Sequence, residues 1–215
     1  MMNNGVFISV ESIDGAGKTT QTKFLAEYLT SQGFDVVTTR DPGGTPLAEK
    51  IRELLLHEDM NVDTETLLFL ACRSDLLHKV IIPALLEGKV VISDRFHDST
   101  YVYQGVAKRN IANVDMFSYT LHKPFYPKYT LFLDLDLETS IERITSRNSD
   151  KDRFDQLDLE MKKKIDSAYR HRASGEKNRI ITIDAKGSIE DVQSKIAEWV
   201  NEHFTPRHKN LLKNK

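Results

Sequence analysis

The sequence of 215 residues lacks several features that would place it in a broad class of protein. Its single cysteine, Cys72, excludes an internal disulfide and is typical of a reducing compartment. No apolar run approaches the ~20 residues that span a bilayer, and the N-terminal MMNNG has neither the basic nor the apolar region of a secretory signal. We therefore expect a cytoplasmic protein without a membrane partner.

An excess of positive charge is also lacking. The formal net charge is −2 with 29% charged residues, so the composition gives no general reason to expect a nucleic-acid partner. Basic residues gather in residues 205–215, which we interpret as a frayed terminal tail rather than a binding arm. Residues 1–204 contain no repeat and no linker-like stretch, and their length suits a single α/β domain.

Strand and helix patterns alternate along the chain. Apolar, β-branched runs predict strands at residues 6–10, 34–38, 90–93, 129–135 and 179–183. Helical periodicity predicts helices at residues 18–32, 47–56, 63–86, 113–121, 138–146, 157–172 and 189–203. Pro83 should kink or restart the third of these helices. The alternation predicts an α/β fold of three layers, α/β/α, with a central five-stranded parallel sheet.

The strongest local signal is the stretch GVFISVESIDGAGKTT, in which a strand, a glycine-bearing turn and a helix start follow one another. Backbone N–H groups and the helix dipole in such a turn converge on phosphate, and Lys18 adds a point charge. The Thr19 hydroxyl is suited to ligate Mg²⁺. We expect this loop to wrap the phosphates of ATP, with the following residues in contact: Ser12, Ile13, Asp14, Gly15, Ala16, Gly17, Lys18, Thr19 and Thr20.

Ser12 departs from the usual pattern, G-x-x-x-x-G-K-[ST], because it stands where the first glycine belongs. A small side chain is tolerated there if φ is negative, but its β-carbon could narrow the approach to phosphate.

Asp94 and Arg95 follow the predicted strand at residues 90–93, at the edge of the sheet where ligands bind in open α/β folds. A carboxylate near Thr19 could hold Mg²⁺ through water, and an arginine could grip a phosphate with two donors. The alternative is a surface ion pair at a strand end.

Phe69 and Arg73 lie four residues apart on a predicted helix and therefore share one face. An aromatic ring that stacks on a base and an arginine that donates to a base carbonyl would form a nucleobase platform. The alternative, a core phenylalanine beside a surface arginine, stays open for this pair alone. Arg40 follows the second strand and points toward the same ligand edge.

Residues 147–154, RNSDKDRF, are charged and poor in apolar side chains, which predicts a mobile segment. A solvated surface loop is one interpretation. The other is a lid, because phosphoryl transfer needs positive charge on the migrating group and the phosphate loop contains no arginine. Arg147 and Arg153 would supply that charge on closure and help to exclude water.

Taken together, these segments resemble thymidylate kinases, within the P-loop nucleoside monophosphate kinase group. The resemblance extends from about Val6 to Phe204, and its specificity comes from the order and spacing of several motifs. Those motifs are ESIDGAGKTTQ, TTRDPGGTPLAEKIRELLL, LLFLACR, VISDRFHDSTYVYQG, LFLDLDLETSIERITSR and the DRFD at the end of the lid.

The resemblance implies a P-loop NTPase fold, a phosphoryl transfer from ATP to dTMP with Mg²⁺, and a homodimer. It implies that Lys18 contacts the β and γ phosphates and that Thr19, with Asp94, serves the metal. An arginine-free phosphate loop with an arginine lid is typical of the bacterial members.

On the acceptor side the resemblance implies that Asp14 lies near the sugar 3′-hydroxyl or a metal-bound water. Arg40 and Arg95 would grip the acceptor phosphate, Phe69 would stack on thymine and Arg73 would donate to its O4. Tyr103 would exclude a 2′-hydroxyl, and Ser99 and Gln104 would contact the base edge. The residues implied to take part in catalysis are Lys18, Asp94, Arg95, Arg147 and Arg153.

Besides Ser12, two residues depart from the family pattern. Asp41 replaces the more usual glutamate, and Phe96 stands where tyrosine or histidine is common. Rival functions are a kinase for another nucleoside monophosphate, a nucleotide-binding switch and a nucleic-acid-processing ATPase. The guanine-reading motif [NT]KxD of such switches is missing from the sequence, and the basic stripe expected of the ATPase is missing outside the tail at residues 205–215.

Overall fold

A computed structural model describes residues 5–146 and 152–204. The predicted five-stranded parallel sheet is confirmed, with strand order β2-β3-β1-β4-β5. The strands are β1 (Val6–Glu11), β2 (Val36–Arg40), β3 (Val90–Asp94), β4 (Tyr129–Asp134) and β5 (Ile180–Asp184).

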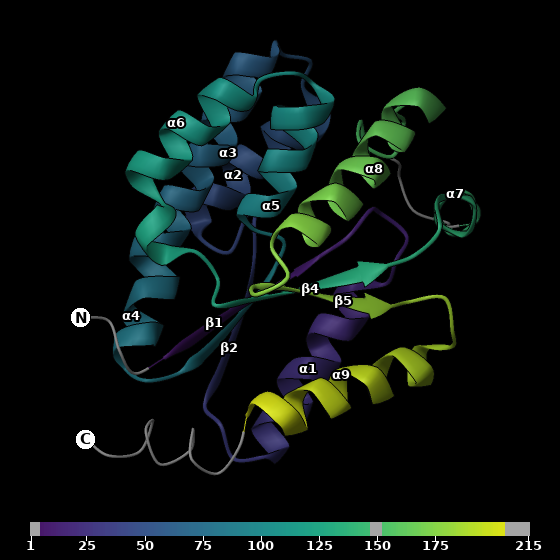
Figure 1. The fold of residues 1–215 in the computed structure, drawn as a ribbon. Helices are drawn as coiled ribbons and strands as arrows, with labels where there is room; N and C mark the ends of the chain where they lie inside the picture. The colour runs from purple at the N-terminus through teal and green to yellow at the C-terminus, as the bar shows by residue number, and fades with distance from the viewer. Residues whose placement is uncertain (1–4, 147–151, 205–215) are drawn as a thin grey trace.

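Helices cover both faces of this sheet, which confirms the three layers (Figure 1). One layer holds α1 (Lys18–Ser31) and α9 (Ile189–His203). The other layer holds α2 (Pro46–His57), α3 (Val62–Leu76), α4 (Ile82–Leu86), α5 (His97–Thr100), α6 (Ile111–Leu121) and α8 (Leu159–Gly175). The short α7 (Leu137–Thr145) follows β4 at the end of the sheet where the phosphate loop also lies.

The central strand β1 is buried along its whole length because both of its faces are covered. Successive side chains of a strand point to opposite faces. Ile8 and Val10 accordingly belong to the core shared with α1 and α9, whereas Phe7 packs with Phe96 in the core of the opposite layer. This continuous apolar run is the expected signature of a parallel strand.

The second strand begins later than predicted, at Val36 rather than Phe34. Gly33, with φ of 84°, reverses the chain after α1, and the Phe34 N–H donates to the Leu29 carbonyl. The Phe34 ring then packs edge-on against Phe204 instead of extending the strand. The shift places Arg40 on the last position of β2, opposite Asp94 of β3.

The long helix predicted at residues 63–86 is present as three consecutive segments. A π-helical stretch, Leu77–Ile81, separates α3 from α4, and Pro83 lies in the first turn of α4. A second π-helical stretch, Tyr101–Ala107, follows α5. The hydrogen bonds of a π-helical turn span one residue more than those of an α-helix, and such turns are frequent at functional sites.

Most of the predicted lid, including Arg147, lies outside the described residues, as does the tail at 205–215. Within residues 5–146 and 152–204, no helix has the length and apolarity needed to cross a membrane.

Candidate active site

The phosphate loop joins β1 to α1 with two glycines in the left-handed region, Gly15 at φ 82° and Gly17 at φ 84°. A β-carbon on Gly15 would lie 2.7 Å from the Ser140 carbonyl oxygen, so that position has no room for a side chain. The Ser140 hydroxyl donates to the Asp14 carbonyl and ties the loop to α7. Gly17 caps the N-terminus of α1, where the unpaired N–H groups of the first turn form an anion site.

Ser12 is fully buried and does not line the phosphate-binding cleft. Its φ lies outside the left-handed region, so a glycine is not required there. The hydroxyl donates to the carbonyl of the next residue, Ile13, at 2.5 Å. The serine side chain therefore points into the loop and leaves the approach to phosphate open.

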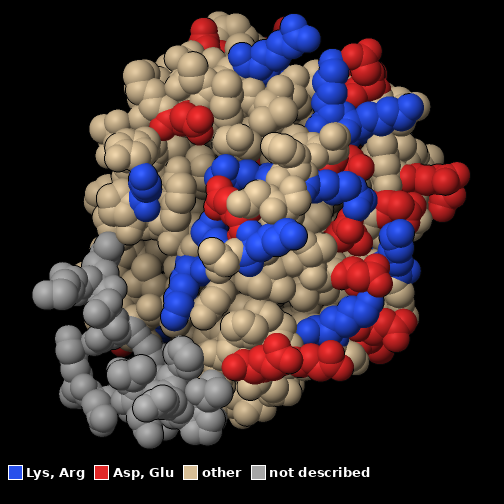
Figure 2. All heavy atoms as spheres, in the orientation of Figure 1, with Lys and Arg blue, Asp and Glu red and all other residues tan. Residues whose placement is uncertain are grey.

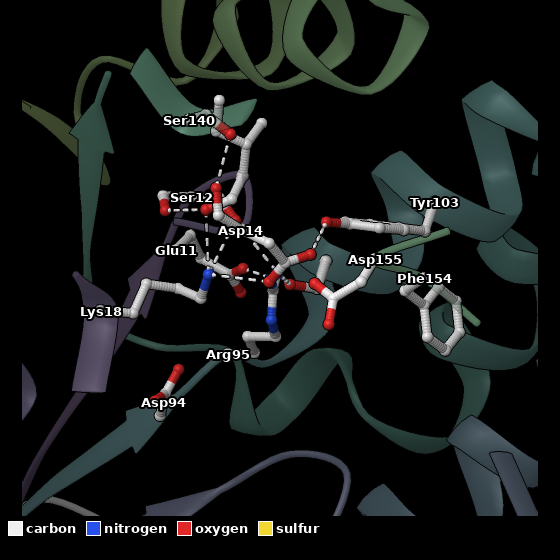
Figure 3. A network of polar contacts seen from close by, with 12 residues as sticks. Glu11, Ser12, Asp14, Lys18, Asp94, Arg95, Tyr103, Ser140, Phe154 and Asp155 are labelled. Carbon is white, nitrogen blue, oxygen red and sulfur yellow. Dashed lines mark hydrogen bonds and ion pairs between the residues drawn. The ribbon is translucent and has the colours of Figure 1, made fainter. Parts of the chain in front are cut away.

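Lys18 folds back over the loop (Figure 3). Its Nζ donates to the Ile13 carbonyl at 3.0 Å and lies 3.4 Å from both the Ser12 carbonyl and Asp14 Oδ1. Burial, followed by repulsion from Arg95, lowers the pKa of this ammonium below its ordinary value. A phosphate in the cleft would offer a stronger counter-charge than the two carbonyls do.

Arg95 and Asp14 form the centre of the polar network in Figure 3. Arg95 Nη2 contacts Asp14 Oδ1 at 2.5 Å, and Tyr103 donates its hydroxyl to Asp14 Oδ2 at 3.0 Å. Although burial disfavours the charge, Arg95 and Lys18 hold the pKa of the Asp14 carboxyl below its ordinary value. The remaining contacts of the Arg95 guanidinium are made by Nη1, with the Ser12 carbonyl and the hydroxyls of Ser99 and Tyr169.

Glu11 supports the turn at Arg95 through hydrogen bonds to the residues that follow it. Its buried carboxylate accepts from the Phe96 N–H at 2.7 Å and from the Ser99 hydroxyl at 2.5 Å. Burial, with the nearby Asp98 carboxylate, raises the pKa of Glu11 to about 7. This residue links β1 to the loop after β3, and sequence reasoning assigned it no role.

The two residues expected to serve a metal lie together, because the Thr19 hydroxyl donates to Asp94 Oδ2 at 2.9 Å. Both side chains offer oxygen ligands, which Mg²⁺ prefers. Both line the larger of two cavities at the site, a cleft that Lys18 also lines. Among the described residues, no group of three or more His, Cys, Asp or Glu side chains is arranged to hold a metal ion. The arrangement fits an ion held by one or two protein groups together with substrate phosphates, as is usual for Mg²⁺.

A pocket lies between α3, α5 and the π-helical stretch after α5, and Phe69 and Arg73 both line it. Arg73 is 1% exposed, with Nε on Asp41 at 2.7 Å and Nη2 on Thr100 at 2.6 Å. Its guanidinium carbon lies 5.0 Å from the centre of the Phe96 ring. Arg73 is therefore no surface residue, and it lines the same pocket as Phe69.

The other predicted acceptor residues lie around this pocket, with one exception. Ser99, Tyr103 and Gln104 line it together with Asp14 and Arg95. Arg40 instead lines the larger cleft, where it pairs with Glu49 at 2.7 Å.

The larger cleft is lined by the phosphate loop, the start of α1 and the ends of β2 and β3. The pocket and the cleft meet, since they share five lining residues: Asp14, Asp41, Arg52, Arg95 and Asp152. One ligand in the pocket and another in the cleft would therefore meet, with their polar ends together, at Asp14 and Arg95.

Comparison with known proteins identifies the family to which this chain belongs. The Thymidylate kinase family model matches residues 10–196. The chain belongs to the thymidylate kinase family. It is 41% identical to a thymidylate kinase of Thiobacillus denitrificans over 199 residues, covering 92% of this chain and 97% of the relative. It is 42% identical to that of a Psychrobacter species over 214 residues, covering 94% and 100%.

A solved structure agrees with these relatives. The crystal structure of thymidylate kinase from Ehrlichia chaffeensis superposes with a TM-score of 0.75 at 31% identity, covering 94% of this chain and 100% of that one. The predicted fold and the resemblance to thymidylate kinases, enzymes that convert dTMP to dTDP, are both confirmed.

Two arginines of this thymidylate kinase differ from the sequence-based expectation: Arg52 lines the site although no role was predicted for it, and Arg153 has partners that were not predicted. Arg52 on α2 lines both the pocket and the cleft, and its Nη1 donates to the Pro42 carbonyl. Arg52 lies within TTRDPGGTPLAEKIRELLL, a segment that resembles the family, and this resemblance was the one sign in the sequence that it belongs to the site. Helix periodicity alone gave no reason to single it out. Arg153, at the end of the predicted lid, contacts Glu65 Oε2 and the Leu55 carbonyl, both at 2.5 Å.

Proposed function

We propose that this thymidylate kinase transfers the γ-phosphoryl group of ATP to dTMP, giving ADP and dTDP. The observation that supports this proposal best is the meeting of the phosphate-loop cleft and the acceptor pocket at Asp14 and Arg95. ATP phosphates at the loop and dTMP in the pocket would then face one another, as an in-line transfer requires.

The nucleophile in this proposal is a phosphate oxygen of dTMP. Its second pKa lies near ~6, as for other phosphate monoesters, so it is largely dianionic at neutral pH. No strong general base is needed, and the protein has to position two anions and offset their repulsion. Lys18 and Arg95 would do so from the rigid parts of the site, and Arg147 and Arg153 from the lid.

Mg²⁺, held by Thr19 and Asp94, would neutralise charge on the ATP phosphates. The Gly17 turn and the first N–H groups of α1 would hold the same phosphates, and Lys18 would leave the Ile13 carbonyl to pair with them. Of the other residues expected at ATP, Asp14, Gly15 and Thr20 line the cleft and are proposed contacts, whereas Ser12, Ile13 and Ala16 are buried and do not line it.

In the acceptor pocket we propose that Phe69 stacks on thymine and that Arg73 donates to its O4. Nη1 is the nitrogen available for this, because the other two are occupied and Nη1 has no partner within the described part of the chain. Tyr103 would face the deoxyribose, with Ser99 and Gln104 at the base edge. Arg40 and Arg52 would join Arg95 at the phosphate.

We further propose that residues 1–204 act as one domain, in a homodimer in the cytoplasm. Large apolar side chains are exposed on α2, α3 and α6, namely Leu47, Leu54, Leu67, Met116, Tyr119 and Leu121. Exposed apolar side chains gathered on neighbouring helices are typical of interfaces. The buried, unpaired Cys72 fits a reducing compartment. No nucleic-acid partner is proposed, because acidic and basic side chains are interspersed over the face in Figure 2.

The test is release of ADP from ATP and Mg²⁺, measured with and without dTMP, dUMP, UMP and dCMP. We expect turnover to depend on the acceptor and to be fastest with dTMP. Preference for another monophosphate would favour the rival kinase, and ATP turnover that ignores every acceptor would overturn the proposal.

A further inference from the structure

Glu65 carries a carboxylate inside the protein, in contact with Gln104, which lines the acceptor pocket. Its side chain is 0% exposed, and it lies on α3 at the same four-residue spacing that separates Phe69 from Arg73. Residues at i, i+4 and i+8 follow one another along a helix face. Glu65 therefore continues the row of side chains to which we assign recognition of the base.

Three donors converge on this carboxylate. Gln104 Nε2 donates to Oε1 at 2.7 Å, Lys108 Nζ contacts both oxygens at 2.7 and 2.8 Å, and Arg153 Nη1 reaches Oε2 at 2.5 Å. Burial opposes its charge, but Lys108 and Gln104, as hydrogen-bond donors, hold the pKa of Glu65 below its ordinary value. Glu65 is thus an ionised group that can only accept hydrogen bonds.

That property determines how the Gln104 side chain is oriented. A carboxylate pairs with the NH₂ end of an amide and rejects the oxygen end, so Gln104 Oε1 is turned away from Glu65. Gln104 lines the pocket, and its Oε1 accepts no hydrogen bond from the described residues. Among the residues that line the pocket, Gln104 Oε1 is thus left as an acceptor and Arg73 Nη1 as a donor.

We propose that Glu65 is a positioning residue that selects thymine over cytosine by fixing the Gln104 amide with its oxygen toward the base. Thymine presents an acceptor, O4, beside the N3–H donor, which complements Arg73 and Gln104. Cytosine presents an N4 amino donor in place of O4 and an acceptor at N3, so both contacts would oppose like groups. This proposal rests on the proposed function.

The variant Glu65→Gln tests it, because an amide pairs with Gln104 in either orientation and the preference is lost. We expect the ratio of kcat/KM for dTMP to that for dCMP to fall at least ~10-fold, mainly through KM, as for loss of one oriented buried hydrogen bond. The ratio of dTMP to dUMP should stay unchanged, because uracil has the same edge and differs by one methyl group. General loosening of the pocket would move both ratios.

Two comparisons separate Gln104 from the cations around Glu65. Lys108→Gln removes one cation but leaves the carboxylate, and should keep the dTMP/dCMP ratio. A double-mutant cycle of Glu65→Gln with Gln104→Ala should be strongly non-additive, since both changes remove the same acceptor. If Glu65→Gln alone is poorly folded, the charge-balanced Glu65→Gln/Lys108→Gln variant takes its place.

The outcomes distinguish the two proposals. An unchanged dTMP/dCMP ratio in a folded Glu65 variant, or additive effects in the cycle, overturns the role of Glu65 while the kinase assignment stands. An unaltered protein that does not phosphorylate dTMP overturns the proposed function itself.

Discussion

Arg95 combines a central place in the polar network with an unusual backbone. Its φ is 67°, in the left-handed region that costs an ordinary residue ~1 kcal/mol or more. The turn is supported by Glu11, which accepts from the N–H of the next residue. Arg109 has a similar φ of 60° but is exposed and lines neither cavity. The protein therefore offers two arginines with matched backbones and different surroundings.

We predict that Arg95→Ala lowers kcat with dTMP by a hundredfold or more, the range found when one preorganised donor to the transition state is removed, ~10²–10³. The physical reason is the loss of the guanidinium that lines both the pocket and the cleft, where the two phosphates are proposed to meet. Arg109→Ala makes the same backbone change and should leave kcat unchanged. Steady-state turnover at saturating ATP measures both, and near-normal turnover in Arg95→Ala would remove this residue from the mechanism.

Sequence reasoning predicted which residues line the candidate pocket better than it predicted their partners. The spacing of four that joins Phe69 to Arg73 is local, so a helix prediction was enough to place them together. Asp41, which holds Arg73, comes from another part of the chain, and no local pattern encodes such a pairing. Glu65 has the same spacing as Phe69 and was still missed, because a glutamate on a helix is normally solvated and only tertiary burial makes it informative.

At the scale of elements, the order of strands and helices was predictable because each depends on a repeating local pattern. The exact ends of the strands and helices were less predictable. Phe34 reads as a strand residue by composition but is drawn into the core against Phe204. The two π-helical stretches, Leu77–Ile81 and Tyr101–Ala107, have no pattern of their own, since tertiary packing and not periodicity decides where a helix widens.

The short helix α5 carries Ser99 into the site and is held by the residue before it. Asp98 is 1% exposed and pairs with Arg172 of α8 at 3.0 Å and with Arg179, just before β5, at 2.7 Å. Burial opposes its charge, but Arg179 and its neighbours hold the pKa of Asp98 below its ordinary value. One carboxylate thus joins α5, α8 and β5.

We predict that Asp98→Asn lowers the free energy of unfolding by ~3 kcal/mol at neutral pH, because breaking a buried pair leaves uncompensated charge inside the protein. Urea unfolding measures the change. Asp184→Asn breaks an exposed pair with Lys195 and should lower the free energy of unfolding far less, because solvent screens a surface ion pair. If both variants lower the free energy of unfolding by the same amount, the ion pairs of Asp98 do not hold α5 in place.

Stability of the whole molecule against acid depends in part on histidines that are buried without charge. His122 is 1% exposed, at the end of α6, and neither ring nitrogen has a hydrogen-bond partner among residues 5–146 and 152–204. Burial, with repulsion from Arg73, lowers its pKa from 6.5 to about 3. Between these two values the unfolded chain binds a proton at His122 that the folded protein does not. The free energy of unfolding therefore falls as the pH is lowered through this window.

We predict that His122→Leu keeps or raises stability at pH 7, because no hydrogen bond is lost, and reduces the loss of stability on acidification. The difference from the parent should grow by up to ~1.4 kcal/mol for each pH unit below 6.5, the full linkage of one proton. Urea unfolding at pH 6.5, 5.5 and 4.5 measures it, and comparison with the parent cancels groups common to both, such as Glu11. The exposed His171→Leu, whose side chain is not among the charges that act on His122, is the control and should run parallel to the parent. Parallel curves for His122→Leu as well would show that this imidazole is not protonated when the protein unfolds.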